Sequence, residues 1–140
     1  MILRFKKNSP NAQTPTKAHP TDAGFDMYVA QVSIDEAAGI ITYNTSISVE
    51  IPAGHVGLLF PRSSVYKTQQ SLCNSVGVVD SGYRGDVQFK YYLRNREALY
   101  NVGDKCGQIV IMPYPEVVFE EAAELADSDR GEGGFGSTGK

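Results

Sequence analysis

A guanidinium group and two hydroxyl groups stand together where a short apolar run, residues 55–60, ends at a proline. Arg62 offers a bidentate fork that matches phosphate oxygens, and the hydroxyls of Ser63 and Ser64 add further hydrogen bonds. A helix beginning at Ser64 would direct its free amide groups toward the same anion. An ordinary serine cap beside a surface arginine has the same sequence, so this segment alone leaves phosphate binding and helix capping open.

The stretch 74–86 carries the most chemistry, and we interpret it as a β-hairpin with a polar rim. The amide of Asn74 has a donor and an acceptor, enough to recognise one edge of a base. Asp80 could orient and deprotonate a water molecule, and the ring of Tyr83 could form a flat wall against a sugar. The alternative is a hairpin in which residues 80–82 only form the turn.

Two further turns carry polar groups suited to a triphosphate. Asp22 and Asp26 flank a short turn, and their carboxylates could hold the water shell of Mg²⁺, which keeps several waters when it binds triphosphates. Gln108, at the end of the turn 103–108, could bond a phosphate oxygen. The alternatives are two solvated acids in a loop and a glutamine that caps the backbone.

The last eleven residues, 130–140, differ in kind, since five glycines surround the single aromatic residue Phe135. Such a segment cannot bury enough surface to stay ordered alone. It contains partial matches to glycine-rich nucleotide-binding loops, but the strand and helix that those loops require are missing around it. It is therefore either a frayed terminus or a flexible arm that folds over a ligand, with glycine amides and Arg130 around a phosphate.

Period-two alternation and frequent glycine and proline turns indicate an all-β domain that forms a sandwich or barrel. The predicted strands are 46–51, 55–60, 86–93, 108–112 and 117–119. One face of the strand 86–93 carries Val87, Phe89, Tyr91 and Leu93. Weak helix signals cover 64–71, where one or two turns could form, and 120–127, which is either a short helix or an extended linker. The segment 31–43 has no motif, and no role is assigned to it.

Length and composition fit one cytoplasmic domain. A chain of 140 residues, 41% of them hydrophobic, has room for a single core. The net charge of -3 argues against binding to nucleic acid or to an anionic membrane, which favours a basic face. No apolar stretch approaches the ~18 residues of a membrane span, and the basic start lacks the apolar run of a signal peptide. Cys73 and Cys106 fit free thiols in a reducing cytosol better than a disulfide.

The order of these motifs along the chain resembles the five ordered motifs of the trimeric dUTPase family. They are residues 22–26, 61–64, 74–86, 103–108 and 130–139. The resemblance implies a jelly-roll-like β-barrel or sandwich, the dUTPase-like β-clip, in residues 1–129, followed by a flexible arm at 130–140 that closes over the active site. It also implies a homotrimer with three shared active sites, each at a subunit interface and built from three chains.

The roles of the base and sugar residues follow from this resemblance. Asp80 matches the aspartate that activates the attacking water and meets the sugar 3′-hydroxyl. Tyr83 matches the tyrosine beneath the deoxyribose, whose ring leaves no room for a 2′-hydroxyl. Asn74 and the backbone around Val78 match the hairpin that reads uracil, and Gln88 is expected to contribute to the base pocket.

The triphosphate residues carry over in the same way. Asp26 matches the acid that supports magnesium-bound waters rather than the metal itself, and Phe135 matches the ring that stacks on uracil. The matched phosphate ligands in the body of the chain are Arg62, Ser63, Ser64 and Gln108. The groups of the arm expected to bind substrate, its γ-phosphate above all, are Arg130, Gly136, Ser137 and Thr138.

The implied reaction is hydrolysis of dUTP to dUMP and pyrophosphate with Mg²⁺, by attack of an Asp80-activated water at the α-phosphorus. It would keep uracil out of DNA and supply dUMP for dTMP synthesis. Departures from the family pattern are small: Cys106 stands where an aliphatic residue is common, and Asp86 where glutamate is common.

Two other functions are compatible with such a fold. A dCTP deaminase resembles dUTPase and also carries an Arg-Ser-Ser segment, but it would need a catalytic glutamate in the strand after residues 74–86. Residues 86–94 contain none. A non-catalytic partner-binding protein on the same fold would be expected to have lost Asp80, Tyr83 or the arm, and all three are present.

Overall fold

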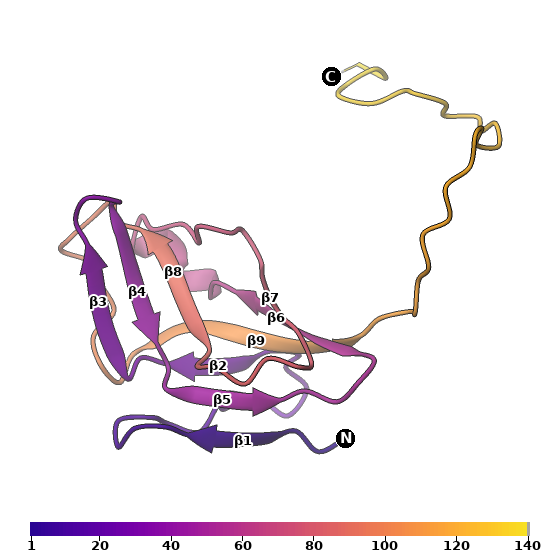
Figure 1. Cartoon of the computed structure of the whole chain (residues 1–140). Helices are drawn as coiled ribbons and strands as arrows, with labels where there is room; N and C mark the ends of the chain where they lie inside the picture. Colours follow the sequence, from indigo (N-terminus) through magenta and orange to yellow (C-terminus); the bar gives the residue numbers. More distant parts are fainter. Residues whose placement is uncertain (140) are drawn as a thin grey trace.

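Short strands and one 3₁₀ turn make up the regular structure of residues 1–139, the part of the chain that the computed structural model describes. Figure 1 shows their arrangement. The elements are β1 (Arg4–Lys7), β2 (Phe25–Tyr28), β3 (Gln31–Asp35), β4 (Ile40–Asn44), β5 (Ile47–Glu50), β6 (His55–Phe60), the 3₁₀ turn η1 (Ser63–Lys67), β7 (Gly77–Val79), β8 (Gln88–Tyr92) and β9 (Lys105–Pro113).

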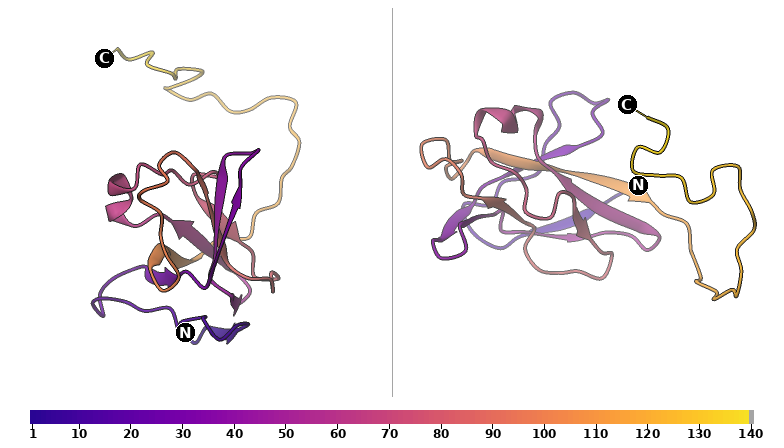
Figure 2. Two further views of the ribbon diagram at one scale, coloured as in Figure 1. Left: turned by 90° about the vertical axis from the view of Figure 1, so that its left-hand side faces the viewer. Right: turned by 90° about the horizontal axis from the view of Figure 1, so that it is seen from above.

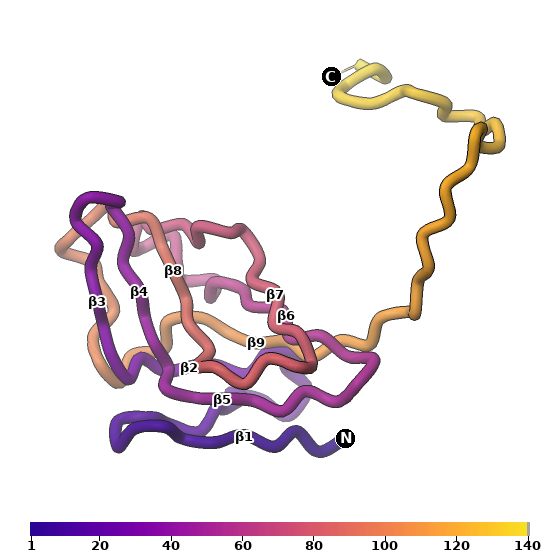
Figure 3. The backbone as a smooth tube through the Cα atoms, in the orientation of Figure 1, coloured from indigo at the N-terminus to yellow at the C-terminus, as the bar shows by residue number. Residues whose placement is uncertain are grey.

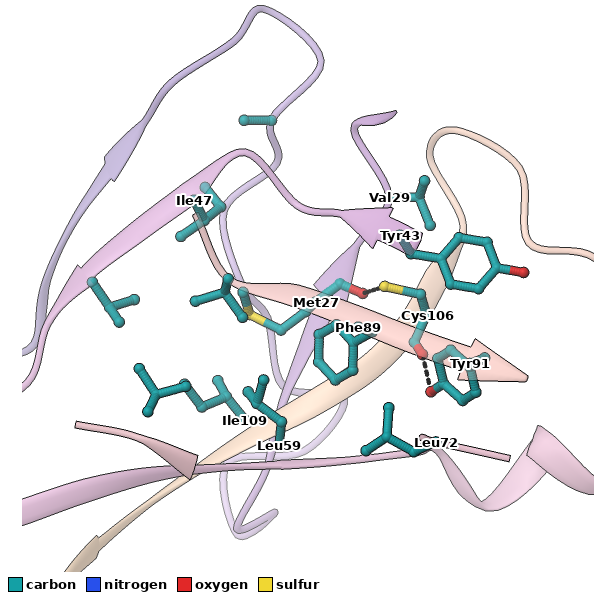
Figure 4. Close-up of a cluster of buried hydrophobic side chains, with 14 of the residues drawn as sticks. Met27, Val29, Tyr43, Ile47, Leu59, Leu72, Phe89, Tyr91, Cys106 and Ile109 are labelled. Carbon is teal, nitrogen blue, oxygen red and sulfur yellow. Dashed lines mark hydrogen bonds between the residues drawn. The ribbon is translucent and has the colours of Figure 1, made fainter. Parts of the chain in front are cut away.

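The strands form three antiparallel sheets, with the orders β1-β5, β2-β9-β6-β7 and β3-β4-β8. The sheet β3-β4-β8 packs its inner face toward β2 and β9, and the hydrophobic core lies between these layers (Figures 1 and 4). The expected all-β, jelly-roll-like fold is confirmed.

Period-two alternation places the large core side chains. Phe89 and Tyr91 of β8 are fully buried, and their neighbours in the strand face outward. Figure 4 shows both rings pointing from β8 toward Met27 and Cys106. The hydroxyl of Tyr91 donates to the carbonyl oxygen of Cys106 at 2.6 Å. Without this hydrogen bond, burying the hydroxyl would destabilise the fold. The predicted inner face of 86–93 is therefore confirmed, with Val87 buried and Leu93 packed against the core.

Several local predictions about the strands need correction. The segment 31–43, which received no assignment, contains β3 and most of β4. Residues 117–119 are not a strand: their side chains are 63–99% exposed, and an apolar run without a neighbouring strand has no partner for its backbone groups. The last strand begins at Lys105, earlier than the predicted Gln108.

The expected hairpin at 74–86 is also wrong. β7, which lies within this segment, pairs with β6, whereas β8, which follows the segment, pairs with β4, so the two strands belong to different sheets. Residues 80–87 therefore form a loop that connects two sheets, and we call it the 80–87 loop. The helical signal at 64–71 corresponds to the shorter 3₁₀ turn η1.

Beyond β9 the chain leaves the body in an extended path (Figures 2 and 3). Of the two alternatives for residues 120–127, the extended linker is the one observed. Backbone hydrogen bonds within 128–139 close only local turns, such as Ser137 N to the carbonyl oxygen of Gly134. No helix among residues 1–139 has the length and apolar character needed to cross a membrane.

Candidate active site

A cavity of about 390 Å³ opens between β7, β8 and the 80–87 loop. It brings together five of the residues singled out from the sequence: Asn74, Val78, Asp80, Tyr83 and Gln88. Its floor is apolar, formed by Leu59 and Leu72 among others, and its rim is polar. This combination suits a flat heterocycle with a few polar edges.

The wall that carries Asn74 and Val78 is held by the backbone. The amide of Cys73 donates to the carbonyl oxygen of Lys90 at 2.9 Å, which ties residues 72–74 to β8. β7 is the edge strand of its sheet and pairs on one side only, with β6. The outer backbone groups around Val78 therefore have no neighbouring strand, as a base-reading edge requires, and Val78 itself lines the cavity.

Asp80 and Tyr83 face the same cavity because a tight turn joins them. The amide of Tyr83 donates to the carbonyl oxygen of Asp80 at 3.0 Å, so residues 80–82 do form a turn, although it is not the turn of a hairpin. The hydroxyl of Tyr83 donates to the carbonyl oxygen of Asp86 at 3.1 Å. The ring lies against Gly85, where any β-carbon would overlap it. These contacts hold the ring of Tyr83 in place as a wall of the cavity. The residue remains 46% exposed, so one face of the ring is open.

Two cavity residues had not been identified from the sequence. Cys73 and Lys90 both line the cavity, and the ammonium of Lys90 donates to the hydroxyl of Thr42 at 3.0 Å. Burial raises the pKa of the Cys73 thiol, and the nearby Lys90 offsets part of that rise. The thiol is consequently protonated at neutral pH and presents a weakly polar surface.

A second polar cluster lies where β2, β6 and β9 meet. Gln108 of β9 pairs with Asp26 of β2 on one side and with Phe60 of β6 on the other. The segment that follows Phe60 therefore begins close to Asp26. Nε of Arg62 lies 3.1 Å from Oδ1 of Asp26. Nζ of Lys105 lies 2.7 Å from Oδ2 of the same carboxylate. Two cations share one acid, so the cluster has a net positive charge suited to an anion.

The remaining predicted phosphate ligands adjoin this cluster. The side-chain nitrogen Nε2 of Gln108 donates to the carbonyl oxygen of Pro61 at 3.0 Å, and this hydrogen bond fixes the turn that carries Arg62. Gly24 lies against the oxygen of the same side-chain amide, where an added β-carbon would overlap Oε1 of Gln108. Ser63 and Ser64 begin η1, and no side chain caps that turn. Lys105 was missed because its role depends on the pairing of β2 with β9.

A magnesium ion fits this cluster only together with a bound phosphate compound that supplies further oxygen ligands. Within residues 1–139 no group of three or more His, Cys, Asp or Glu side chains could hold a metal ion. One partly exposed carboxylate, Asp26, is present, and its two oxygens already accept from cations. Mg²⁺ commonly binds through one or two carboxylates plus substrate phosphates and retained waters, which is the donor set available here.

The two groups do not share a cavity. None of Asp26, Arg62 and Gln108 lines the cavity that holds Asp80. The predicted arm residues also lie apart, because the chain carries them away from the body (Figures 1 and 2). The ring of Phe135 is fully exposed. One copy of the chain therefore presents a base-and-sugar site, a phosphate cluster and an arm as three separate pieces.

Comparison with known proteins identifies the family. The family model described as dUTPase matches residues 10–139. The chain belongs to the dUTPase family. The family resemblance inferred from the five motifs is confirmed, and with it the assignment to a family of enzymes.

Curated relatives and solved structures agree with this membership. A deoxyuridine 5′-triphosphate nucleotidohydrolase of Leifsonia xyli subsp. xyli is 37% identical over 128 residues, covering 89% of this chain and 84% of the relative. That of Clostridium kluyveri is 36% identical over 141 residues and covers 99% of both. The Staphylococcus bacteriophage 80alpha dUTPase with dUPNHPP has a TM-score of 0.85 and 28% identity, covering 99% of both chains.

One further structure concerns metal binding. A mutant dUTPase from phage phi11 of S. aureus, described as coordinating a structural Mg(II) ion, has a TM-score of 0.76 and 26% identity. The match covers 89% of this chain and 99% of that one.

Proposed function

We propose that this dUTPase-family chain hydrolyses dUTP to dUMP and pyrophosphate, with Mg²⁺ on the triphosphate. The observation that carries the proposal is the single cavity shared by the carboxylate of Asp80, the ring of Tyr83 and the edge strand β7. The names of the relatives support the same substrate. Such a reaction would keep uracil out of DNA and supply dUMP for dTMP synthesis.

Base selection rests on the edge strand. The outer backbone groups around Val78 and the amide of Asn74 can pair with the polar edge of uracil, as a neighbouring strand would. A methyl group at C5 would clash with this wall and exclude dTTP. Gln88 lines the same cavity and can add a hydrogen bond to the base.

Sugar selection rests on Tyr83. The hydrogen bond to the Asp86 carbonyl and the contact with Gly85 hold the ring in one place. A deoxyribose can lie on its open face, whereas a 2′-hydroxyl would collide with it. This steric element makes discrimination against UTP a matter of exclusion rather than of weaker attraction.

Asp80 is the proposed general base. It follows β7 directly, its side chain is exposed to the cavity, and it can accept a proton from water within reach of the α-phosphorus. The bond that forms joins the water oxygen to the α-phosphorus, and the bond that breaks releases pyrophosphate. No covalent intermediate is required.

The phosphate chain would be held by the cationic cluster, with hydrogen bonds from Ser63, Ser64 and Gln108. Arg62 and Lys105 neutralise charge on the phosphate oxygens, and their pairing with Asp26 keeps both side chains aligned. Mg²⁺, when bound with the triphosphate beside Asp26, would neutralise part of the negative charge on the phosphate chain. Asp26 would accept hydrogen bonds from waters on the ion.

We further propose that the active site is assembled from several copies in a homotrimer. The support for this proposal is that the three pieces lie apart in one chain, so that neighbouring copies would supply the missing pieces to each cavity. Residues 1–129 would be the β domain and 130–140 a flexible arm that closes on bound nucleotide. Phe135 would stack on uracil, and the groups that close on the phosphates would be Arg130, Gly136, Ser137 and Thr138.

The test is an assay of the purified protein with Mg²⁺ against dUTP, dCTP, dTTP and UTP, in which pyrophosphate and the nucleoside product are measured separately. We expect pyrophosphate and dUMP from dUTP and negligible product from the other three. Deamination of dCTP would identify a dCTP deaminase instead. No turnover of any of the four, with nucleotide still bound, would indicate a partner-binding protein on this fold.

A further inference from the structure

The carboxylate of Asp86 is held by two neutral amides from distant parts of the chain. Nδ2 of Asn8 donates to Oδ1 at 2.6 Å, and Nδ2 of Asn44 donates to Oδ2 at 3.0 Å. Asn8 follows β1, and Asn44 ends β4. Within residues 1–139 no Lys, Arg or His side chain pairs with this carboxylate. Both of its oxygens are therefore committed to these amides.

Both asparagines are themselves anchored. The backbone amide of Asn8 donates to the carbonyl oxygen of Ser46 at 2.8 Å, and its side chain also donates to Oγ of Ser48 at 2.8 Å. Oδ1 of Asn44 accepts from the amide of Ser46 at 2.7 Å. Ser46 is buried and has a φ of 50°, in the left-handed region that a non-glycine residue adopts only when its surroundings hold it there. The corner 44–46 is thus a rigid anchor.

Asp86 connects this anchor to the catalytic cavity. Its carbonyl oxygen accepts the hydrogen bond from the hydroxyl of Tyr83, so the residue held by the two amides also holds the ring. The next residue is fixed to the same anchor: the amide of Val87 donates to the carbonyl oxygen of Ile47 at 2.8 Å. Figure 3 shows the connection from β7 to β8 descending toward β5. The other end of the loop continues β7, which pairs with β6.

We propose that Asn8 and Asn44 form an amide clamp on Asp86 that sets the position of Tyr83, and so the exclusion of UTP. All three are positioning residues, because each acts through Tyr83 rather than on the nucleotide. The proposal rests on the function proposed above. It makes the N-terminal segment, which lies outside the five motifs in the sequence, part of the device that selects the sugar.

The clamp requires a carboxylate at residue 86. Each amide contributes a donor, and a carboxylate is acceptor-only, so both partners are satisfied. In Asp86→Asn one amino group would face another, and one of the two hydrogen bonds would be lost. Asp86→Glu keeps two acceptors on a longer stem and should restore most of the selectivity.

The sharpest test compares Asn8→Ala with Ser48→Ala. Both variants remove the hydrogen bond between Asn8 and Ser48, but only Asn8→Ala also removes the bond to Asp86. Losing a hydrogen bond to a charged group should lower the ratio of kcat/KM for dUTP to that for UTP by about tenfold. We expect this drop in Asn8→Ala and Asp86→Asn, mainly through faster UTP turnover and a lower kcat for dUTP, and none in Ser48→Ala.

Amide hydrogen exchange of the same proteins without nucleotide provides a readout that is independent of activity. Exchange in the 80–87 loop should speed up in Asn8→Ala and remain unchanged in Ser48→Ala. An unchanged dUTP to UTP ratio in Asn8→Ala would overturn the clamp, as would equal effects of the two variants. If the unmodified protein fails to turn over dUTP, the proposed function fails, and unchanged loop exchange in Asn8→Ala would then refute the clamp separately.

Discussion

The Nε atom of Arg62 lies 3.1 Å from Oδ1 of Asp26, and this ion pair joins the proposed phosphate clamp to the proposed magnesium-supporting acid. Lys105 holds the other carboxylate oxygen at 2.7 Å. The three side chains are between 16% and 34% exposed, so solvent weakens the pairing only in part. They form one unit in which a change at Asp26 is transmitted to both cations.

The first prediction concerns Asp26→Asn. The amide keeps the shape but removes the charge that aligns Arg62 and Lys105 and that would accept from magnesium-bound waters. We expect kcat/KM for dUTP to fall by roughly tenfold to a hundredfold, and the Mg²⁺ concentration for half-maximal rate to rise. A magnesium titration at fixed dUTP measures both.

The matched control for this change is Asp35→Asn. Asp35 ends β3 and accepts a hydrogen bond from the amide of Ala38 in the turn to β4, far from the cluster. Its magnesium titration should coincide with that of the unmodified protein. An Asp26→Asn curve that coincides as well would show that this carboxylate has no role in metal binding.

The second prediction concerns Asp80→Asn. An amide cannot take a proton from water at neutral pH, so the general base is lost while the cavity keeps its shape. Turnover of dUTP should fall by about 10²-fold to 10⁴-fold. Calorimetric titration with a non-hydrolysable dUTP analogue should give a nearly unchanged Kd. Near-normal turnover would remove Asp80 from the mechanism.

Local patterns predicted the parts of this molecule that depend on local physics. Alternation along 86–93 placed Phe89 and Tyr91 in the core, because period two is fixed by strand geometry alone. Residues 117–119 have the same apolar composition but no partner strand, and pairing is a non-local property. The hairpin prediction at 74–86 failed for the same reason, since β7 and β8 found partners elsewhere in the chain.

The residues of the candidate site differ in the same way, between those recognised from local sequence and those that act through non-local contacts. Asn74, Asp80 and Tyr83 could be predicted because their chemistry and spacing lie within one stretch. Lys105 and Asn8 could not, because each works through a contact made across the fold: 79 residues separate Lys105 from Asp26, and 78 separate Asn8 from Asp86. A surface lysine and a surface asparagine carry no sequence signal for such contacts.

The third prediction concerns packing at Gly107. This glycine of β9 lies beneath the ring of Phe89, and an added methyl group would overlap three ring atoms. Because Phe89 is fully buried, the ring has little room to move. Gly107→Ala should lower the free energy of unfolding by about 1–3 kcal/mol. In Gly82→Ala the added methyl meets open space, and the change should be below about 0.5 kcal/mol. Urea denaturation of both variants measures the difference.

The fourth prediction concerns alkaline pH. Burial raises the pKa of the Cys106 thiol from 9.0 to about 12, so the folded protein keeps this thiol neutral where the unfolded chain ionises it. The stabilisation is fully present below pH 9.0 and is lost as the pH rises toward 12. At pH 10 the thiol alone should reduce the free energy of unfolding by about 1.4 kcal/mol. Unfolding of Cys106→Ala from pH 8 to pH 10.5 should therefore depend less steeply on pH, and an equal slope would contradict the assignment.

The fifth prediction tests whether separate copies share one active site. Deleting residues 130–140 should lower turnover by on the order of a hundredfold with the thermal midpoint unchanged, because residues 130–139, the described part of this segment, do not belong to the hydrophobic core. Asp80→Asn chains and arm-deleted chains should each be nearly inactive alone. Refolded together, they should regain activity, since some sites would combine an intact Asp80 with an intact arm from another copy. A mixture as inactive as its parts would mean that Asp80 and the arm act within one chain.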